Sequence, residues 1–204
     1  MSQSSRNWLK QQQRDPFVRL ARNHEYRSRA VYKLMEIDRK DGLFRPGQSI
    51  VDLGAAPGSW SQYARARVGN TGRIIALDIL PMEPLPPVTV LQGDITDAGI
   101  YRICLESLAG QMVDLVISDL APNLTGIRST DQARSMALAE LVYEFSGRVL
   151  QPGGGMLIKL FQGEGTDAFR KEISQRFERV VVRKPAASRD HSREFYILAR
   201  GYDV

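Results

Sequence analysis

One turn constrains the fold of this chain more than any other feature: Asp52-Leu53-Gly54-Ala55-Ala56-Pro57-Gly58-Ser59-Trp60. It directly follows an apolar run at residues 49–53, which is typical of a buried strand. Glycine adopts positive φ easily and has no Cβ, so a ligand can approach the main chain closely. In open α/β sheets, ligands bind at the carboxyl ends of the strands. The turn therefore predicts a parallel-sheet protein with a nucleotide-like ligand beside Gly54 and Gly58.

The turn is not a phosphate-binding loop. The chain has neither the G-x-G-x-x-G spacing of dinucleotide folds nor the G-x-x-x-x-G-K-[ST] pattern of NTPases. Asp52 at the end of the strand and Pro57 inside the turn suit a ligand that carries an amino-acid ammonium and no pyrophosphate. S-adenosylmethionine fits this description.

Strand and helix signals alternate through the rest of the chain. The predicted strands are residues 49–53, 73–77, 88–91, 113–118, 156–161, 179–183 and 194–199. The predicted helices are residues 28–38, 59–67, 97–109, 131–150 and 167–177, the last four opened by Ser or Asp as N-caps. Apolar strands joined by helices indicate a doubly wound, mostly parallel sheet. Only ten residues separate the last two strands, so these are expected to form an antiparallel hairpin.

Carboxylates follow the ends of the second and third strands. Asp78 lies 24 residues after Gly54, where an acidic side chain can accept hydrogen bonds from ribose hydroxyls. Asp94 follows the third strand and could meet an adenine amine. With Asp52 and the glycine turn, these residues form the predicted cofactor site.

A lysine interrupts a strand that is otherwise apolar. Lys159 lies within Met156-Leu157-Ile158-Lys159-Leu160-Phe161, where a buried ammonium costs several kcal/mol unless it is paired or neutralised. Asp119 ends the fourth strand, which neighbours the first strand in the usual strand order. We expect both side chains to point toward the glycine turn.

Positive charge gathers in the amino-terminal part of the chain. Residues 1–45 hold eleven Lys and Arg and five acidic side chains, whereas the rest holds 17 basic and 18 acidic ones. Such segregation is the electrostatic footprint of a polyanion-binding protein. Candidate nucleic-acid contacts are Arg22, Arg27, Arg29, Arg189 and Arg193.

Composition excludes several other classes. No apolar run approaches the ~18 residues of a membrane span, and the amino terminus lacks the apolar region of a secretory signal. Cys104 is the single cysteine, which is compatible with a reducing compartment and a buried, inert thiol. We expect a cytoplasmic monomer without membrane attachment, protein partner or metal.

Five separated motifs together resemble the FtsJ/RrmJ family, the RlmE-type ribosomal RNA 2′-O-ribose methyltransferases. The motifs are Ser28-Arg29-Ala30-Val31-Tyr32-Lys33-Leu34, residues 52–60, residues 118–123, Lys159-Leu160-Phe161-Gln162-Gly163-Glu164-Gly165, and Ser192-Arg193-Glu194-Phe195-Tyr196. The resemblance implies a Rossmann-like S-adenosylmethionine-dependent methyltransferase fold with a seven-stranded sheet. It also implies transfer of a methyl group to a uridine 2′-hydroxyl in the A loop of 23S rRNA, in the large ribosomal subunit. The expected domains are a basic, RNA-contacting extension at residues 1–27 and one methyltransferase domain at residues 28–204.

The same resemblance assigns site residues. The family's K-D-K-E tetrad falls on Lys33, Asp119, Lys159 and Glu194, and its cofactor contacts fall on Gly58, Trp60, Asp78, Asp94 and Asp119. A free lysine, with a pKa of about 10.4, is protonated at neutral pH and cannot accept a proton. Burial and the like charge of Lys33 would both disfavour the ammonium form of Lys159, which is therefore the expected general base. Asp119 would orient it, and Glu194 would hold Lys33 or the substrate hydroxyl.

Three alternatives remain open at this stage. A methyltransferase of the same family could act on tRNA or an mRNA cap. A dinucleotide oxidoreductase shares the fold class but would need a glycine spacing that is missing here. A non-catalytic RNA-binding or ribosome-assembly factor could keep the fold without turnover.

Overall fold

The computed structural model describes residues 15–123, 125–188 and 192–203. Its seven strands form one sheet in the order β3-β2-β1-β4-β5-β7-β6. Neighbouring strands from β3 to β5 are parallel, and β7 is antiparallel to both β5 and β6. The predicted Rossmann-like methyltransferase fold with a C-terminal antiparallel hairpin is confirmed. The strands are β1 (Ser49–Leu53), β2 (Arg73–Asp78), β3 (Thr89–Gln92), β4 (Val113–Ser118), β5 (Leu150–Phe161), β6 (Phe177–Arg183) and β7 (Glu194–Tyr202).

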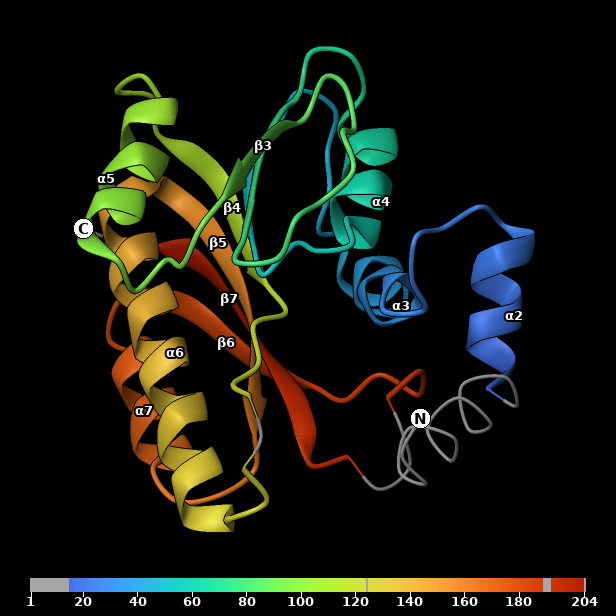
Figure 1. Ribbon diagram of the computed structural model, residues 1–204. Helices are drawn as coiled ribbons and strands as arrows, with labels where there is room; N and C mark the ends of the chain where they lie inside the picture. Colours follow the sequence, from blue (N-terminus) through green and yellow to red (C-terminus); the bar gives the residue numbers. More distant parts are fainter. Residues whose placement is uncertain (1–14, 124, 189–191, 204) are drawn as a thin grey trace.

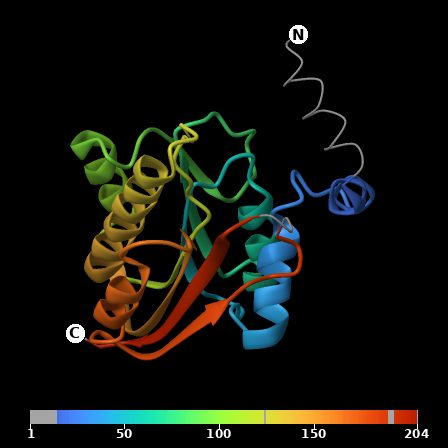
Figure 2. The same cartoon turned by 90° about the horizontal axis from the view of Figure 1, so that it is seen from below.

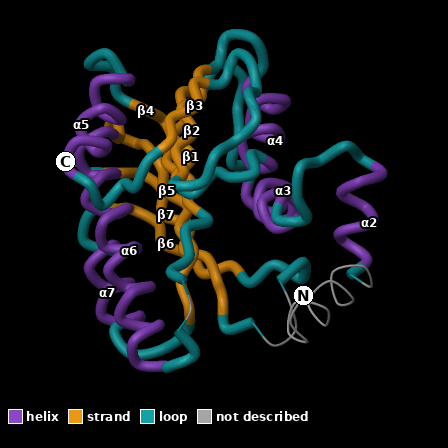
Figure 3. Tube along the Cα trace, viewed as in Figure 1, coloured by secondary structure: helices purple, strands orange, loops and turns teal. Residues whose placement is uncertain are grey.

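Helices cover both faces of the sheet. They are α2 (Pro16–Asn23), α3 (Val31–Asp41), α4 (Ser59–Val68), α5 (Ala98–Ser107), α6 (Arg128–Val149) and α7 (Thr166–Ile173). Figure 1 shows α5, α6 and α7 on one face and α3 and α4 on the other, and Figure 3 shows the sheet between them. Viewed from below in Figure 2, α2 lies outside this sandwich, beyond α3 and α4. None of the helices within the described ranges is both long and apolar enough to cross a membrane.

The two faces of the sheet bury separate apolar clusters. Val51 and Met156 pack on the side of α5, α6 and α7, whereas Ile50 and Leu157 pack on the side of α3 and α4. Successive strand residues point to opposite faces, so a strand that is buried on both faces needs an unbroken apolar run. This explains the runs seen in the sequence. Cys104 is fully buried in the first cluster, as predicted, and burial raises the pKa of its thiol to about 11.

The predicted N-caps are correct for only one helix. The carboxylate of Asp97 accepts hydrogen bonds from the first turn of α5, at 2.8 and 3.0 Å. The other three helices begin after residues that offer no side-chain cap: Gly58, Ile127 and Gly165. Asp131, the predicted N-cap of α6, lies inside its first turn and binds the preceding loop at Thr125 instead.

Some element boundaries also differ from the prediction. β5 begins at Leu150, because Leu150 and Gly155 pair with β4 around an irregular register despite the intervening glycines. α7 ends at Ile173, and Phe177 already belongs to β6. No element was predicted at α2, whose short sequence forms a helix because Asp15 caps it and Phe17 packs on Tyr32, with ring centroids 5.5 Å apart.

Candidate active site

The glycine turn lies at the carboxyl edge of the sheet and has the backbone conformation that was predicted. Gly54 and Gly58 have φ angles of +79° and +106°. A Cβ at Gly54 would lie 2.9 Å from the side chain and 3.0 Å from the main-chain nitrogen of Leu120. Glycine at this position therefore lets the chain after β4 approach the turn. A pocket of about 240 Å³ opens between them, lined by Gly54, Asp78, Asp94 and residues 120–123 among others.

Two carboxylates at the pocket also organise the main chain around it. Asp78 accepts hydrogen bonds from the amides of Ala56 and Leu80, both at 2.8 Å, and so ties the turn to the end of β2. Asp94 accepts from the amide and the hydroxyl of Thr96, at 2.9 and 2.8 Å. A carboxylate offers about four lone-pair sites, so both side chains can still accept bonds from a ligand.

Asp52 is a fully buried carboxylic acid beneath the turn. The hydroxyl of Ser61 donates to its Oδ2 at 2.6 Å, while no group of the described residues reaches its Oδ1. Burial raises the pKa of Asp52 to about 7, against the opposing hydrogen bond from Ser61 and with further repulsion from Asp119 and Asp78. A buried, unpartnered carboxylate oxygen near two other carboxylates suits a cationic ligand group.

Trp60 lies in the turn motif, but its side chain faces the protein interior. The indole is 2% exposed, donates from Nε1 to the carbonyl of Ala30 at 2.9 Å, and packs on the ring of Tyr196. It therefore fixes α4 against α3. A contact between Trp60 and a ligand would have to come from its main chain.

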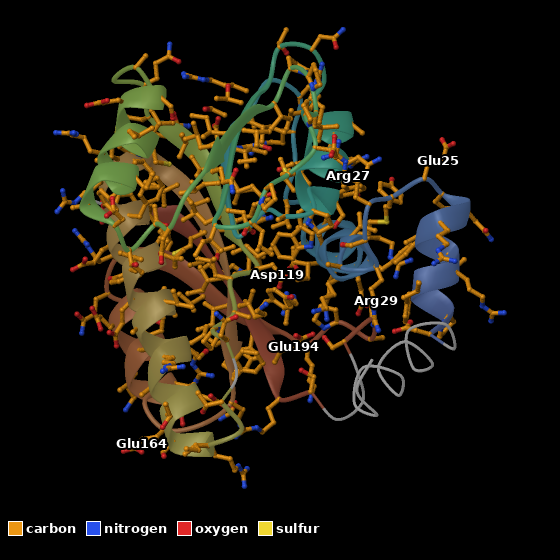
Figure 4. The ribbon with its side chains drawn as sticks, viewed as in Figure 1. Glu25, Arg27, Arg29, Asp119, Glu164 and Glu194 are labelled. Carbon is orange, nitrogen blue, oxygen red and sulfur yellow. The ribbon has the colours of Figure 1, made fainter. Side chains whose placement is uncertain are left out.

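The tetrad residues meet as two buried ion pairs. Lys159 Nζ lies 3.1 Å from Asp119 Oδ1 and also donates to the carbonyl of Asp119, while Lys33 Nζ lies 2.6 Å from Glu194 Oε1. The two lysine side chains are only 7% and 13% exposed. Figure 4 shows Asp119 and Glu194 near each other beside β7. Four elements or their ends, namely α3, β4, β5 and β7, thus bring together residues far apart in the chain.

Tyr196 joins these pairs and was not predicted as a site residue. Its hydroxyl donates to Asp119 Oδ1 at 2.7 Å, and Lys33 Nζ lies 5.9 Å from its ring centroid. Burial raises the pKa of Tyr196 well above 10, and the charges of Asp119 and Glu194 raise it further, so the hydroxyl keeps its proton. The sequence could have indicated Tyr196 as a site residue, because it follows Glu194 by two residues and alternate residues of a strand share a face.

Asp119 is ionised in this surrounding. Burial by itself raises the pKa of its carboxyl, but Lys159, Lys33 and the Tyr196 hydroxyl together bring the pKa below its usual value. Asp119 therefore carries a negative charge at neutral pH and holds the Lys159 amine at the carboxyl edge of the sheet.

The candidate RNA contacts differ in their surroundings. Arg27 donates to three main-chain carbonyls, and Arg29 binds Asp15 and the carbonyl of Ala187. Arg22 and Arg193 are exposed, the latter donating to the carbonyl of Gln162 at 3.3 Å. Arg189 lies outside the described residues. Arg22 and Arg193 are thus the members of the set whose surroundings are most open to a polyanion.

Comparison with known proteins agrees with this geometry. The model of a family described as FtsJ-like methyltransferase matches residues 26–202. The chain belongs to the FtsJ-like methyltransferase family. This methyltransferase is 53% identical over 201 residues to a Pseudomonas fluorescens protein named ribosomal RNA large subunit methyltransferase E, covering 98% of this chain and 96% of the relative. A relative of the same name from Alkalilimnicola ehrlichii is 54% identical over 200 residues, covering 98% of this chain and 96% of that one.

Solved structures share the fold of this FtsJ-like methyltransferase. A crystal structure from Plasmodium falciparum, titled as a ribosomal RNA methyltransferase, is 29% identical and superposes with a TM-score of 0.79. The match covers 87% of this chain and 98% of that one. A Clostridium thermocellum structure is 14% identical, with a TM-score of 0.53 over 82% of this chain and 96% of that chain, and it supports the fold alone.

Proposed function

We propose that the protein transfers a methyl group from S-adenosylmethionine to the ribose 2′-hydroxyl of a uridine in the A loop of 23S rRNA, within the large ribosomal subunit. The observation that carries this proposal is the buried Lys159–Asp119 pair, with 3.1 Å between Nζ and Oδ1, at the sheet edge that also bears the glycine turn. The names of the bacterial relatives, which match almost the whole chain, support the large-subunit substrate.

The residues around the turn fit S-adenosylmethionine. Asp78 and Asp94 line the pocket and offer acceptors for the ribose hydroxyls and the adenine amine. The unpartnered Oδ1 of Asp52, buried beneath the turn, suits the ammonium of the amino-acid part. The main chain of Gly54, which lines the pocket, would lie against the ligand, whereas Arg27 and Met82 cover Gly58. When bound, the cofactor would supply an electrophilic methyl group, with its sulfur as the neutral thioether leaving group for in-line attack by an oxygen nucleophile.

The four tetrad residues have distinct roles in this proposal. Lys159 accepts the proton of the 2′-hydroxyl at Nζ, which requires that it first lose its own proton. Asp119 holds Nζ in place through its carboxylate and its carbonyl. Lys33 and Glu194, 2.6 Å apart, would position the ribose beside Lys159. Correct alignment of the reacting atoms can by itself lower the activation free energy by several kcal/mol.

The test combines labelled S-adenosylmethionine with large ribosomal subunits that lack the modification. We expect label in 23S rRNA and a reverse-transcription stop in the A loop at low nucleotide concentration. Label that enters only tRNA or capped mRNA would favour the other substrates of this family. Subunit binding without any methyl transfer would favour an assembly factor, and binding of NAD in place of S-adenosylmethionine would favour an oxidoreductase.

Asp78→Ala is expected to weaken S-adenosylmethionine binding by roughly 1.5 to 3 kcal/mol, the scale of a hydrogen bond to a charged group. The reason is twofold, because the change removes the ribose acceptor and also frees the amides of Ala56 and Leu80. Calorimetry measures the affinity, with Asp167→Ala on exposed α7 as the control. Unchanged affinity in a folded variant would remove Asp78 from the cofactor site.

Neutralising Arg19 and Arg22 together is expected to weaken RNA binding and to lower its salt slope by about 0.7 for each phosphate that the protein no longer neutralises. Both are exposed on α2, whereas Arg27 and Arg29 are engaged within the protein. Glutamine replacements at exposed Arg102 and Arg170, on α5 and α7, are charge-matched controls on the other face of the sheet. If RNA binding by the two double variants has equal salt slopes, the RNA contacts another surface, and Arg193 is then the leading candidate.

A further inference from the structure

A short segment between α2 and α3 crosses the start of α4. The carbonyl of Glu25 accepts from Gln62 Nε2 at 2.8 Å, and the amide of Arg27 donates to Gln62 Oε1 at 3.2 Å. One residue later, the hydroxyls of Ser28 and Ser59 lie 2.7 Å apart. Three successive contacts therefore hold this segment against the first turn of α4, which begins at the glycine turn.

The guanidinium of Arg27 connects two loops at the cofactor site. Nη1 donates to the carbonyl of Pro57 at 3.2 Å and to that of Glu83 at 2.7 Å, and Nη2 donates to the carbonyl of Pro84 at 2.8 Å. Pro57 belongs to the glycine turn. Glu83 and Pro84 belong to the loop at residues 79–88 between β2 and β3, which we call the proline-rich loop. Figure 4 shows Arg27 beside α4, on the segment that leads from Glu25.

Packing at Gly58 shows how closely Arg27 approaches the turn. A Cβ at Gly58 would lie 2.8 Å from Arg27 Nη1 and 2.7 Å from the sulfur of Met82. Both distances are shorter than a side chain tolerates, so Arg27 and Met82 occupy the space over Gly58. The absence of a side chain at this glycine makes room for the arginine.

The geometry of these contacts requires arginine. A planar guanidinium presents five N–H donors in a fixed fork, whereas the ammonium of lysine is a compact point charge. The fork donates to three carbonyls of the two loops at once, two through Nη1 and one through Nη2. Loops that are held in their bound arrangement before the ligand arrives lose less conformational entropy on binding, which increases affinity.

We propose that Arg27 is a positioning residue for S-adenosylmethionine, which clamps the glycine turn to the proline-rich loop and so preorganises the cofactor site. The inference rests on the proposed function, because it assumes that this cofactor lies at the glycine turn. It gives Arg27 a role other than the predicted phosphate contact, and it links the segment after the basic helix α2 to cofactor affinity.

Calorimetry with S-adenosylmethionine and with S-adenosylhomocysteine, in the absence of RNA, tests the clamp. We expect Arg27→Gln to weaken both affinities by about tenfold or more, and Arg27→Lys to weaken them by about threefold or more, since lysine keeps the charge but not the fork. Arg19→Gln removes the same charge from exposed α2 and should leave both affinities within about twofold of the wild type.

Three further readouts separate positioning from other roles. At saturating S-adenosylmethionine, Arg27→Gln should regain a single-turnover rate within about threefold of the wild type, so that KM changes and kcat does not. Its salt slope for RNA should match the wild type. Hydrogen exchange of the amides at residues 54–60 should be faster in Arg27→Gln without ligand.

The outcomes distinguish this inference from the proposed function. A wild-type protein that binds neither ligand would overturn both. Wild-type binding with unchanged affinity in Arg27→Gln and Arg27→Lys would overturn the clamp alone, as would a loss of rate that saturating cofactor does not restore. If Arg27→Gln does not fold, Arg27→Lys decides, because it keeps the charge and the aliphatic stem.

Discussion

Lys159→Ala is expected to lower the single-turnover rate of methyl transfer by at least ~100-fold, the lower end of what a positioned general base contributes, while both substrates still bind. Without Lys159 Nζ, the 2′-hydroxyl has no buried base next to Asp119 to accept its proton. Lys171→Ala, at an exposed position of α7, is the matched control and should keep the wild-type rate.

The pH dependence of the bound complex identifies the base. The wild-type rate should rise with pH to a plateau, as general-base catalysis does, and the alanine variant should lack that inflection. Tyr196→Phe keeps the ring that packs on Trp60 but removes the hydroxyl donor to Asp119, so it should keep the inflection with a smaller loss of rate. If the wild type and Lys159→Ala share one inflection, Lys159 has a structural or electrostatic role instead.

Asp52→Asn is expected to stabilise the ligand-free protein at pH 8 by on the order of 2 kcal/mol and to weaken S-adenosylmethionine binding by at least about tenfold. The pKa of Asp52 is raised from 3.8 to about 7 in the folded protein, so the native state binds this proton more tightly than the unfolded state does. Above pH 7 the folded protein must hold a buried, partly unpartnered charge, which costs stability. As pH falls from 7 toward 4 that cost disappears.

Urea unfolding of both proteins at pH 5 and pH 8 measures the effect. The advantage of Asp52→Asn should be large at pH 8 and clearly smaller at pH 5, and Asp167→Asn, an exposed Asp-to-Asn change, should show no such pattern. The wild-type affinity for S-adenosylmethionine should also fall as pH drops from 7.5 to 5.5, because a protonated Asp52 cannot pair with the ammonium. An advantage that is the same at both pH values would mean that Asp52 does not titrate in this range.

The proposed site shows where sequence patterns are informative. The glycines of the turn, Asp78, Asp94 and the lysine within β5 stood out because each breaks the local pattern of an apolar strand or follows its end. Parallel strands bring their carboxyl ends to one edge, so the pattern and the topology together placed these residues along the same edge of the sheet, where Gly54, Asp78 and Asp94 line the pocket. The N-caps of the helices were harder to predict, because Ser and Asp side chains also form hydrogen bonds with loops, as Asp131 does with the amide of Thr125.

What the amino-acid order determined was the fold class, the position of the cofactor turn and the identity of the groups at the sheet edge, since all three follow from periodicity, glycine placement and strand ends. The tertiary structure alone decided which groups became partners. Lys33 meets Glu194 across most of the chain, Asp52 keeps a buried oxygen without a partner among the described residues, and Arg27 binds the carbonyls of Pro57, Glu83 and Pro84. The physical reason is that every residue has a main-chain carbonyl, so the acceptors that hold Arg27 leave no mark in the sequence, and an arginine that looks like a phosphate contact becomes a clamp only once the chain has folded around it.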